Sequence, residues 1–264
     1  MASGADKMKI SAVIITFNEE DRLPETLASL RGIADEIVVI DSFSTDRTAE
    51  IAKQNQAHFY QNRFKDYGQQ KNFAMQKAGH EWILNLDADE RVSPELKKAL
   101  LQLKEKPPAA EVSAFAIKRK AFYLGRWVTH SGWYPDRKVR LFRKNAASWQ
   151  GRIHEKLIVT GQVASLPGDI LHYTYRDISD HVQRLNRYSS FQAEEIVTQG
   201  KKFLWLRLFI LPPVTFLRHY LWRLGFIDGF TGLVIAAISS WGTALKYYKA
   251  IALKRPPASR IPGS

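Results

Sequence analysis

Short apolar segments alternate with amphipathic segments through the first third of the chain. Four segments of β-branched and aliphatic residues, each bounded by polar residues, span 9–16, 36–40, 58–60 and 82–86. Apolar runs of this length predict buried strands of a parallel sheet. The segments between them predict helices at 22–30, 47–54 and 69–78, and Leu23, Leu27 and Leu30 share one face of the first. Strands that alternate with helices predict a parallel α/β sheet.

Acidic loops follow three of the predicted strands, at residues 18–21, 41–46 and 87–90. In a parallel α/β sheet such loops converge beyond the carboxyl ends of the strands, where ligands bind. An extended chain points Asp87 and Asp89 to the same side. Two carboxylates so placed repel each other unless a cation lies between them, and Mg²⁺ and Mn²⁺ prefer oxygen ligands. This pattern predicts a metal–diphosphate site; the alternative is an acidic turn before a helix that begins at Ser93-Pro94.

The middle of the chain combines strand patterns with an aromatic loop. Residues 113–121 and 139–142 alternate as strands do, and the loop between them contains Tyr123, Trp127, Trp133 and Tyr134. Aromatic rings stack on the apolar faces of sugars, so we expect Trp133 and Tyr134 to contact an acceptor. The alternative is that the aromatic side chains of this loop fill the core.

The C-terminal part of the chain, residues 201–255, is basic and contains interleaved tryptophans. It has one acid, Asp228, and nine basic residues: Lys201, Lys202, Arg207, Arg218, Arg223, Lys246, Lys249, Lys254 and Arg255. Residues 229–245 are uncharged but slightly short for a membrane span. As a helix, this segment and the turn after it place apolar and polar side chains on different faces, with Val234, Ile238, Trp241, Leu245 and Tyr248 on the first and Ser239, Thr243, Lys246 and Lys249 on the second.

Basic, tryptophan-rich amphipathic helices lie in the membrane interface and bind anionic lipid. The sequence therefore predicts membrane-associating helices over residues 201–255. The alternative is a pair of helices packed on the sheet or in a dimer interface, which would make the protein a homo-oligomer.

Composition narrows the classes of partner. The chain has 264 residues and a net charge of +13, which implies an anionic partner such as nucleic acid, anionic lipid or a phosphorylated substrate. The acidic strand-end loops and the lack of a nucleic-acid-binding motif argue against nucleic acid.

There is no cysteine, which excludes disulfides and thiolate metal sites. Residues 1–9 lack the apolar core of a signal peptide, so we expect no secretion signal and loose tails at 1–8 and 256–264.

Three motifs, in order and spacing, carry a resemblance to a known family. They are ITFNEE (15–20), VVIDSFSTDRT (38–48) and QQKNFAMQKAGHEWILNLDADE (69–90). Residues 9–92 resemble the nucleotide-sugar domain of glycosyltransferase family 2. The resemblance implies a GT-A fold, which is a Rossmann-like α/β/α sandwich, and an inverting enzyme with a D-x-D motif, a divalent metal (Mg²⁺ or Mn²⁺) and a UDP-sugar donor.

The resemblance also implies roles for individual residues. A nucleotide pocket is lined by Thr16, Asn18 and Glu19, Asp41 bonds the uracil edge, and Lys71 lies near the nucleotide. Asp87 and Asp89 face the ribose of the sugar nucleotide and the metal. The chain departs from the family at Ser42-Phe43-Ser44, where many members have Asp-Gly-Ser, which leaves the base contact open. For Asp41 and Asp46 the alternative is capping of the following helix, and we assign that role mainly to Asp46.

Candidates for the remaining roles come later in the chain. An inverting transfer needs a general base, and the carboxylates in the expected region are Glu155, our first choice, and Asp136. The alternative for Glu155 is a salt bridge. His172 is a candidate third metal ligand or a structural histidine. Arg184 and Arg187 resemble the Q-x-x-R-W motif of processive members, and at this spacing they would clamp a diphosphate or lipid phosphate or face solvent.

The chain as a whole divides into functional segments. We expect a nucleotide-sugar half at 9–112, an acceptor and catalytic-base half at 113–200, and amphipathic helices at 201–255. The segments WYPDRKVRLFR (133–143) and GFIDGFTG (225–232) are similar to the lipopolysaccharide-core branch of the family, the β-1,4-glucosyltransferases that act on inner-core heptose.

That similarity implies UDP-glucose as donor, a lipid A-core glycolipid as acceptor, and a peripheral location on the cytoplasmic face of the inner membrane. Two alternatives stand beside it. One is sugar transfer to a polyprenyl phosphate. The other, which is not an enzyme, is a basic nucleic-acid-binding protein.

Overall fold

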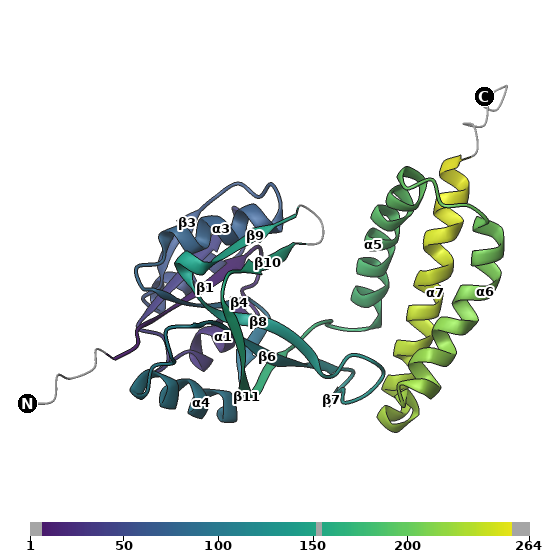
Figure 1. Ribbon diagram of the computed structural model, residues 1–264. Helices are drawn as coiled ribbons and strands as arrows, with labels where there is room; N and C mark the ends of the chain where they lie inside the picture. The colour runs from purple at the N-terminus through teal and green to yellow at the C-terminus, as the bar shows by residue number, and fades with distance from the viewer. Residues whose placement is uncertain (1–6, 152–154, 255–264) are drawn as a thin grey trace, which may run out of the picture. The chain divides into compact units, whose positions relative to one another are not determined.

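The computed structural model describes residues 7–151 and 155–254, drawn in colour in Figure 1. The predicted tail at 256–264, most of the tail at 1–8 and His154 lie outside the described residues. The chain forms two compact units. The first comprises Met1–Lys120 and Asp136–His172, and the second comprises Ala121–Pro135 and Tyr173–Ser264. The strands that follow residue 112 therefore belong largely to the same unit as the nucleotide-sugar half, and residues 173–200 belong with the C-terminal helices.

The first unit is built on one mixed sheet with the strand order β3-β2-β1-β4-β8-β6-β11-β5. Its parallel part consists of β1 (Ile10–Thr16), β2 (Glu36–Asp41), β3 (His58–Gln61) and β4 (Trp82–Asp87). The remaining strands are β5 (Glu90–Val92), β6 (Val112–Tyr123), β8 (Asp136–Arg143) and β11 (Gln162–His172). Of these, β8 pairs antiparallel with β4 and with β6, and β11 pairs antiparallel with β5. The structure confirms the four predicted parallel strands to within one residue at each end.

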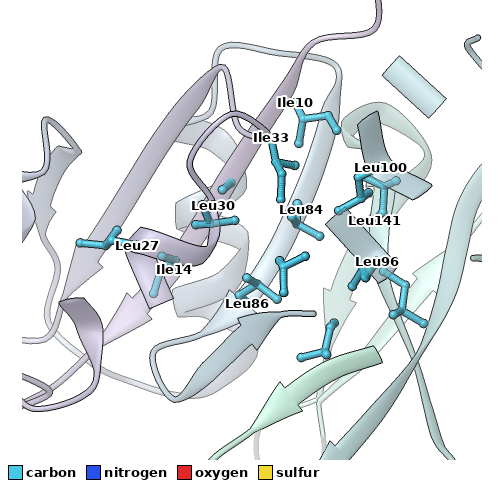
Figure 2. Packing of buried hydrophobic residues seen from close by; sticks show 14 of the residues in the cluster. Ile10, Ile14, Leu27, Leu30, Ile33, Leu84, Leu86, Leu96, Leu100 and Leu141 are labelled. Atoms are coloured by element: carbon cyan, nitrogen blue, oxygen red, sulfur yellow. The ribbon is translucent and has the colours of Figure 1, made fainter. Parts of the chain in front are cut away.

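Helices cover both faces of this sheet. Side chains of β1 alternate between two cores, because successive residues of a strand point to opposite faces. Ile10 and Ile14 pack with α1 (Leu23–Ser29), α2 (Thr48–Gln54) and α4 (Pro94–Glu105), as Figure 2 shows for α1 and α4. Val13 packs with α3 (Tyr67–Lys77) on the other face, where the hairpin of β9 (Ala147–Gln150) and β10 (Lys156–Val159) also lies. The three layers confirm the predicted α/β/α sandwich.

The second unit is mainly helical. It contains α5 (Ile178–Thr198), α6 (Leu204–Leu217), a π-helical turn η2 (Arg218–Trp222), a 3-10 turn η3 (Gly225–Asp228) and α7 (Gly229–Lys254), and β7 (Arg126–Trp127) pairs with the end of β6. α7 packs against both α5 and α6 (Figure 1). Their shared core contains Ala193, Ile196, Leu204, Leu208, Tyr247, Ala250 and Ile251.

Packing differs along the two predicted faces of the 229–245 helix. On the apolar face Ile238 is buried, whereas Trp241 is 52% exposed and Tyr248 is 50% exposed. Two residues of the polar face bond neighbouring helices. The Lys249 ammonium donates to the Asn186 carbonyl (2.6 Å) and to the hydroxyl of Ser189 (2.8 Å) on α5. The Thr243 hydroxyl lies 3.3 Å from that of Thr215 on α6. The helix is therefore the packing partner of α5 and α6, which Lys249 and Thr243 of its polar face contact.

Candidate active site

The parallel strands bring the predicted acidic residues to one edge of the sheet. In the register of β1 with its neighbours, Thr16 lies opposite Asp41 of β2, and Ile15 lies opposite Asp87 of β4. Strand ends are rigid because their backbone groups are bonded on both sides. Asp41, Asp87 and the loops that follow them are therefore fixed side by side, as the α/β topology predicted.

Hydrogen bonds join the loop after β1 to the loop after β2. The Asn18 side-chain carbonyl accepts from the backbone N–H of Thr45 (2.9 Å), and the Glu20 carboxylate accepts from that of Arg47 (3.1 Å). In return, the backbone N–H of Glu19 donates to the hydroxyl of Thr48 (2.9 Å). The loops that hold the predicted nucleotide-binding residues therefore act as one structural element.

Asp41 is fully buried at the centre of this element. Its carboxylate accepts from the Ser44 backbone N–H (2.8 Å), from the Ser44 and Thr16 hydroxyls, and from the Gln61 amide (3.4 Å). These bonds fix the shape of the loop. The contact of Asp41 with a uracil edge stays a prediction.

Asp46 lies one residue before the N-cap of α2, Arg47, and bonds the helix start from there. Its carboxylate accepts from the backbone N–H groups of Thr48 and Glu20, at 3.0 Å each, and so ties the start of α2 to the first loop. Burial alone would raise the pKa of Asp46, but these hydrogen bonds outweigh it and leave the pKa below its ordinary value.

Asp87 lies in a buried network of charges. Arg140 donates to Asp87 (2.7 Å) and to the fully buried Glu90 (2.6 Å), and Lys71 lies 3.6 Å from Asp87. Arg119 donates to Glu90 at 3.2 Å. Burial raises the pKa of Asp87, but the charges of Arg140 and Lys71 exceed that effect and hold the pKa well below its usual range. Asp87 is therefore ionised and fixed in position.

Asp89 and His172 form a second, adjacent pair. Residue 172 of β11 lies opposite Glu90 of β5, and this register places the His172 Nε2 atom 3.4 Å from the Asp89 carboxylate. Arg22 contacts the same oxygen of Asp89 at 3.3 Å. Two ligands of one Mg²⁺ or Mn²⁺ ion, each about 2.1 Å from it, lie roughly 3 Å apart. The 3.4 Å separation of Asp89 and His172 is close to this value, and their role as metal ligands stays a prediction.

Asp87, the other aspartate of the predicted metal site, is not grouped with them. Among residues 7–151 and 155–254 no cluster of three or more His, Asp and Glu side chains has the geometry of a metal site. The physical reason is that Asp87 bonds Arg140 and Lys71, whereas Asp89 faces Arg22 and His172. The prediction that a cation bridges the two aspartates therefore requires Asp87 to exchange partners.

Lys71 connects the donor-side carboxylate to our first candidate for the base. Its ammonium lies 3.0 Å from the Glu155 carboxylate and 4.5 Å from the centre of the Trp149 ring, and the side chain is almost completely buried. α3 approaches this point closely, since a Cβ on Gly68 would lie 2.8 Å from the Gly151 carbonyl oxygen. The salt bridge that we gave as the alternative for Glu155 is therefore present. It joins Glu155 to the strand end that holds Asp87.

Asp136, the second candidate for the base, has a different environment. Arg119 donates to one of its oxygens through Nε (3.0 Å) and Nη2 (2.7 Å), and Lys138 lies 3.2 Å from the other. Burial raises the pKa of Asp136, but these cations lower it below the ordinary value overall. Asp136 therefore has two cationic partners, whereas Glu155 has one, Lys71. The choice of Glu155 over Asp136 as the base stays a prediction.

The other predicted residues belong to the second unit. Trp133 packs with Tyr123, Tyr175 and His181, at ring separations from 5.6 to 6.0 Å, which matches the alternative that these aromatics fill a core. Tyr134 is half-buried. On α5, Arg184 donates to Asp180 at 2.9 Å and Arg187 is exposed. Roles in acceptor or phosphate binding stay predictions for all four.

Three arginines of the site were not found from the sequence. Arg22, Arg119 and Arg140 contact Asp89, Asp136 and Asp87, respectively. A signal was present for Arg140, because it interrupts the apolar run of a predicted strand (VRLF, 139–142) and a cation in such a place requires a buried anion. Arg22 and Arg119 carry no comparable signal, since they are two of the 39 basic residues of the chain.

Comparison with known proteins gives a consistent family. The family model described as "Glycosyl transferase family 2" matches residues 11–159. The lipopolysaccharide core biosynthesis glycosyltransferase LpsC of Rhizobium meliloti (strain 1021) is 31% identical over 95% of this chain and 96% of its own. An uncharacterized glycosyltransferase of Rickettsia typhi (strain ATCC VR-144 / Wilmington) is 33% identical over 91% of this chain and 86% of its own.

Solved structures with a similar fold include S. aureus TarS (residues 1–349) in complex with UDP-GlcNAc. It aligns over 94% of this chain and 92% of its own with 16% identity and a TM-score of 0.44. Glucosyl-3-phosphoglycerate synthase from Mycobacterium tuberculosis aligns over 45% of each chain with 22% identity and a TM-score of 0.35. The family model covers more than half of the chain and includes the strand ends with Asp41, Asp87 and Asp89. On this evidence the chain belongs to glycosyltransferase family 2.

Proposed function

We propose that the protein transfers a hexose, most simply glucose, from a UDP-sugar to a heptose hydroxyl of the lipopolysaccharide inner core, with inversion at the anomeric carbon. Membership of glycosyltransferase family 2 supports the class of reaction. The relative whose name states lipopolysaccharide core biosynthesis is similar over nearly the whole of both chains, which supports the acceptor class. The +13 net charge suits an anionic glycolipid.

One observation carries the catalytic part of the proposal. Lys71 joins Glu155 to Asp87, so a candidate base and a donor-side carboxylate are held within contact distance of one ammonium group. In an inverting transfer, the attacking hydroxyl approaches the anomeric carbon from the side opposite the leaving group. The base must therefore lie beside the donor sugar, and the link through Lys71 satisfies this requirement.

The step that follows from this arrangement is a single displacement. The acceptor oxygen bonds to the anomeric carbon while the bond from that carbon to the diphosphate oxygen breaks. The hydroxyl proton passes to Glu155, and UDP leaves with the bonding electron pair. Lys71 donates to Glu155 at 3.0 Å and would hold this carboxylate in position for the proton transfer.

The remaining residues would bind the donor. Thr16, Asn18, Glu19 and Asp41 belong to the joined loops and would form the nucleoside pocket. A divalent cation held by Asp89 and His172, with Asp87 as a third ligand after it exchanges partners, would neutralise charge on the diphosphate leaving group. Arg184 and Arg187 of the second unit would bind phosphate of the glycolipid.

The acceptor class sets the location. A lipid A-core glycolipid is embedded in a membrane, and UDP-sugars are cytoplasmic metabolites. We therefore infer that the protein works as a peripheral enzyme on the cytoplasmic face of the inner membrane. The basic helical unit supports this inference, since it offers cations to an anionic lipid surface.

An assay of UDP release over a panel of donors tests the proposed function. The purified protein is incubated with each UDP-hexose and UDP-N-acetylhexosamine, with or without lipopolysaccharide truncated at the inner-core heptose. We expect UDP release with one hexose donor, stimulated by the truncated lipopolysaccharide. Polyprenyl phosphate serves as the competing acceptor. Stimulation by polyprenyl phosphate alone would replace the lipopolysaccharide proposal, and no release from any donor would contradict the transferase.

A further inference from the structure

Apolar side chains are exposed along α6 and the turn that follows it. In α6, Leu206, Ile210 and Leu217 recur at helical spacing, and Leu221 and Leu224 follow in the turn, all between 42% and 56% exposed. Larger rings flank them, and the most exposed are Phe203, Phe209, Trp222 and Phe230. We call residues 203–230 the α6 surface. So large an apolar area on a helix whose opposite side, Leu204 and Leu208, is already buried against α7 requires a partner.

The charges around this surface are of one sign. Lys201, Lys202, Arg207, Arg218 and Arg223 are exposed within it or beside it. The single acid between Lys201 and Lys254, Asp228, is fully buried, where it accepts hydrogen bonds from residues 129–131. An apolar surface surrounded by cations and lacking an exposed acid is complementary to an anionic bilayer. A protein partner would bind these exposed cations only if it carried a matching acidic surface.

The length and composition of α6 indicate how it would lie. A helix needs about 20 residues to cross the hydrocarbon core, and α6 has 14. Pro212 and Pro213 lie inside it and have no N–H to offer the carbonyls of Leu208 and Phe209. Such carbonyls are tolerated where water reaches them and are costly in hydrocarbon. These features suit a helix that lies in the plane of the interface.

α7 does not provide an alternative span. Among the described residues, Gly225–Lys254 is the one helical segment long and apolar enough to cross a membrane, judged by length and composition. However, α7 packs along α5, to which Lys249 is bonded, and α5 carries the exposed acids Glu194 and Glu195. A spanning α7 would draw these charges toward hydrocarbon, which is costly.

We propose that the α6 surface docks the protein on an anionic bilayer, with its apolar side chains inserted among the lipid headgroups and acyl-chain ends. This proposal rests on the proposed function, because docking would bring the enzyme to a membrane-embedded acceptor. α7 then acts as the support that holds α6 against the rest of the unit. Within the predicted membrane-associating segment 201–255, this proposal assigns the contact to residues 203–230.

Co-sedimentation of the full chain with vesicles tests the surface. We compare phosphatidylcholine vesicles with vesicles that also contain phosphatidylglycerol, at low and high salt. Wild type should bind the anionic vesicles more tightly, and high salt should weaken the binding without abolishing it, because apolar insertion is not screened. Arg207→Gln and Arg218→Gln should each weaken binding to anionic vesicles by roughly fivefold and leave binding to neutral vesicles unchanged.

A matched pair of variants locates the surface. Ile210→Asp with Leu217→Asp places two acids on the α6 surface, at positions 48% and 42% exposed. Val182→Asp with Phe191→Asp makes the same change on α5, at positions 39% and 43% exposed. The first pair should reduce vesicle binding on the order of a hundredfold, and the second should have little effect. Equal loss in both pairs, or wild-type binding by the first, would overturn the proposal.

Tryptophan quenching provides a test that does not depend on the folding of the aspartate variants. Vesicles with brominated acyl chains should quench the fluorescence of the wild-type protein. Trp205→Phe with Trp222→Phe should remove most of that quenching, whereas Trp82→Phe, in the core of the first unit, should not. Quenching that survives without Trp205 and Trp222 would contradict insertion of this surface.

The competing occupant is a second copy of the chain. Light scattering of wild type without lipid would then show a dimer that Ile210→Asp with Leu217→Asp converts to a monomer, and this result would overturn the membrane proposal. The result of the membrane-binding tests is independent of the result of the transferase assay. UDP release from the donor in solution should be unchanged in these variants, and failure of transfer with every donor would leave the vesicle measurements valid.

Discussion

At the scale of single residues, the ammonium of Lys71 organises the candidate site. It is almost completely buried, it contacts Glu155 and Asp87, and it lies over the ring of Trp149. One buried cation thus connects the two carboxylates, so one must be considered together with the other. Asp136 instead contacts Arg119 and Lys138. The distinction between the two candidate bases therefore rests on their cationic partners.

Replacement of Glu155 by Gln tests the assignment of the base. Turnover should fall by roughly 10²–10⁴-fold, because the amide cannot accept the acceptor proton. The affinity for UDP should change little, since the base acts on the acceptor. Asp136→Asn is the matched control. An active Glu155→Gln variant beside an inactive Asp136→Asn variant would show that the base is Asp136.

The pair of Asp89 and His172 makes a prediction about metal. Activity should require Mg²⁺ or Mn²⁺, and Asp89→Ala should abolish it, with Asp87→Ala close behind. His172→Gln should raise the Mn²⁺ concentration needed for half of the full activity, because one ligand is lost. Thermal stabilisation by UDP should increase on addition of Mn²⁺ in wild type and not in Asp89→Ala. Full activity after exhaustive chelation would exclude the metal.

His181 predicts an acid sensitivity of the helical unit. Its imidazole is buried, bonded to the hydroxyl of Tyr123 at 2.9 Å and stacked on Tyr175. Burial lowers the pKa of His181 to about 4, from an ordinary 6.5, and the charge of Arg184 adds to the shift. Below pH 6.5 the unfolded chain therefore binds a proton at this position that the folded chain does not.

The free energy of unfolding should consequently fall by up to about 3 kcal/mol between pH 6.5 and pH 4, with no further loss from this group at lower pH. Chemical denaturation followed by circular dichroism across this range measures it. His181→Gln should lose this part of the pH dependence, and His58→Gln, at an exposed position, should retain it. An unchanged slope in His181→Gln would assign the acid sensitivity to another group.

At the scale of elements, the loop after β2 departs from what its residues prefer. Phe43 has a φ of +63° and is 53% exposed, at a position where a glycine would adopt this conformation without strain. The loop is fixed by the bonds that Asp41 accepts from Ser44, so the conformation does not depend on residue 43. A strained, exposed ring beside the predicted nucleoside pocket points to a ligand that stacks on it.

Phe43→Gly should therefore have opposite effects on stability and binding. The free energy of unfolding should rise or stay level, because strain of about 1 kcal/mol is relieved while glycine adds freedom to the unfolded chain. UDP affinity should fall by roughly tenfold, because base–aromatic stacking is worth about 1–3 kcal/mol. Calorimetric titration with UDP measures this. Phe43→Ala should also lose affinity but without relief of the strain, and wild-type affinity in both variants would contradict stacking.

The sequence predicted correctly those elements whose hydrophobic pattern fits only one environment in a folded protein. Residues 9–16 and 82–86 are apolar throughout because both faces of a central parallel strand are buried, and no other environment explains that pattern. The 229–245 helix was different. Its polar stripe is consistent with water or with polar partners on another helix, and only the fold shows that Asn186, Ser189 and Thr215 occupy that side.

For the site as well, the sequence predicted some residues and missed others. Asp41, Asp87 and Asp89 follow apolar strands, so topology alone brings them to one edge. The proximity of His172 to Asp89 depends on the register of β11 with β5, which no local pattern reveals. The contact of Lys71 with Glu155 joins residues 84 positions apart through the approach of α3 to the segment after β9. Arg22, Arg119 and Arg140 depend on the same long-range packing.

At the scale of the whole molecule, charge divides between the two units. The strand-end site concentrates carboxylates that are matched by buried cations. The helices after residue 200 present unmatched cations beside exposed apolar side chains. The proposed function would use both surfaces, the strand-end site for a soluble nucleotide donor and the basic helices for a membrane-embedded acceptor.

The configuration of the product tests the central claim most directly. The protein is incubated with UDP-glucose, in which the anomeric bond is α, and with lipopolysaccharide that ends at the inner-core heptose. The product is analysed by nuclear magnetic resonance at the new anomeric proton. We expect a β-linked glucose on heptose, formed by wild type and not by Glu155→Gln. An α-linked product, or a β-linked product formed equally well by Glu155→Gln, would contradict displacement with Glu155 as the base.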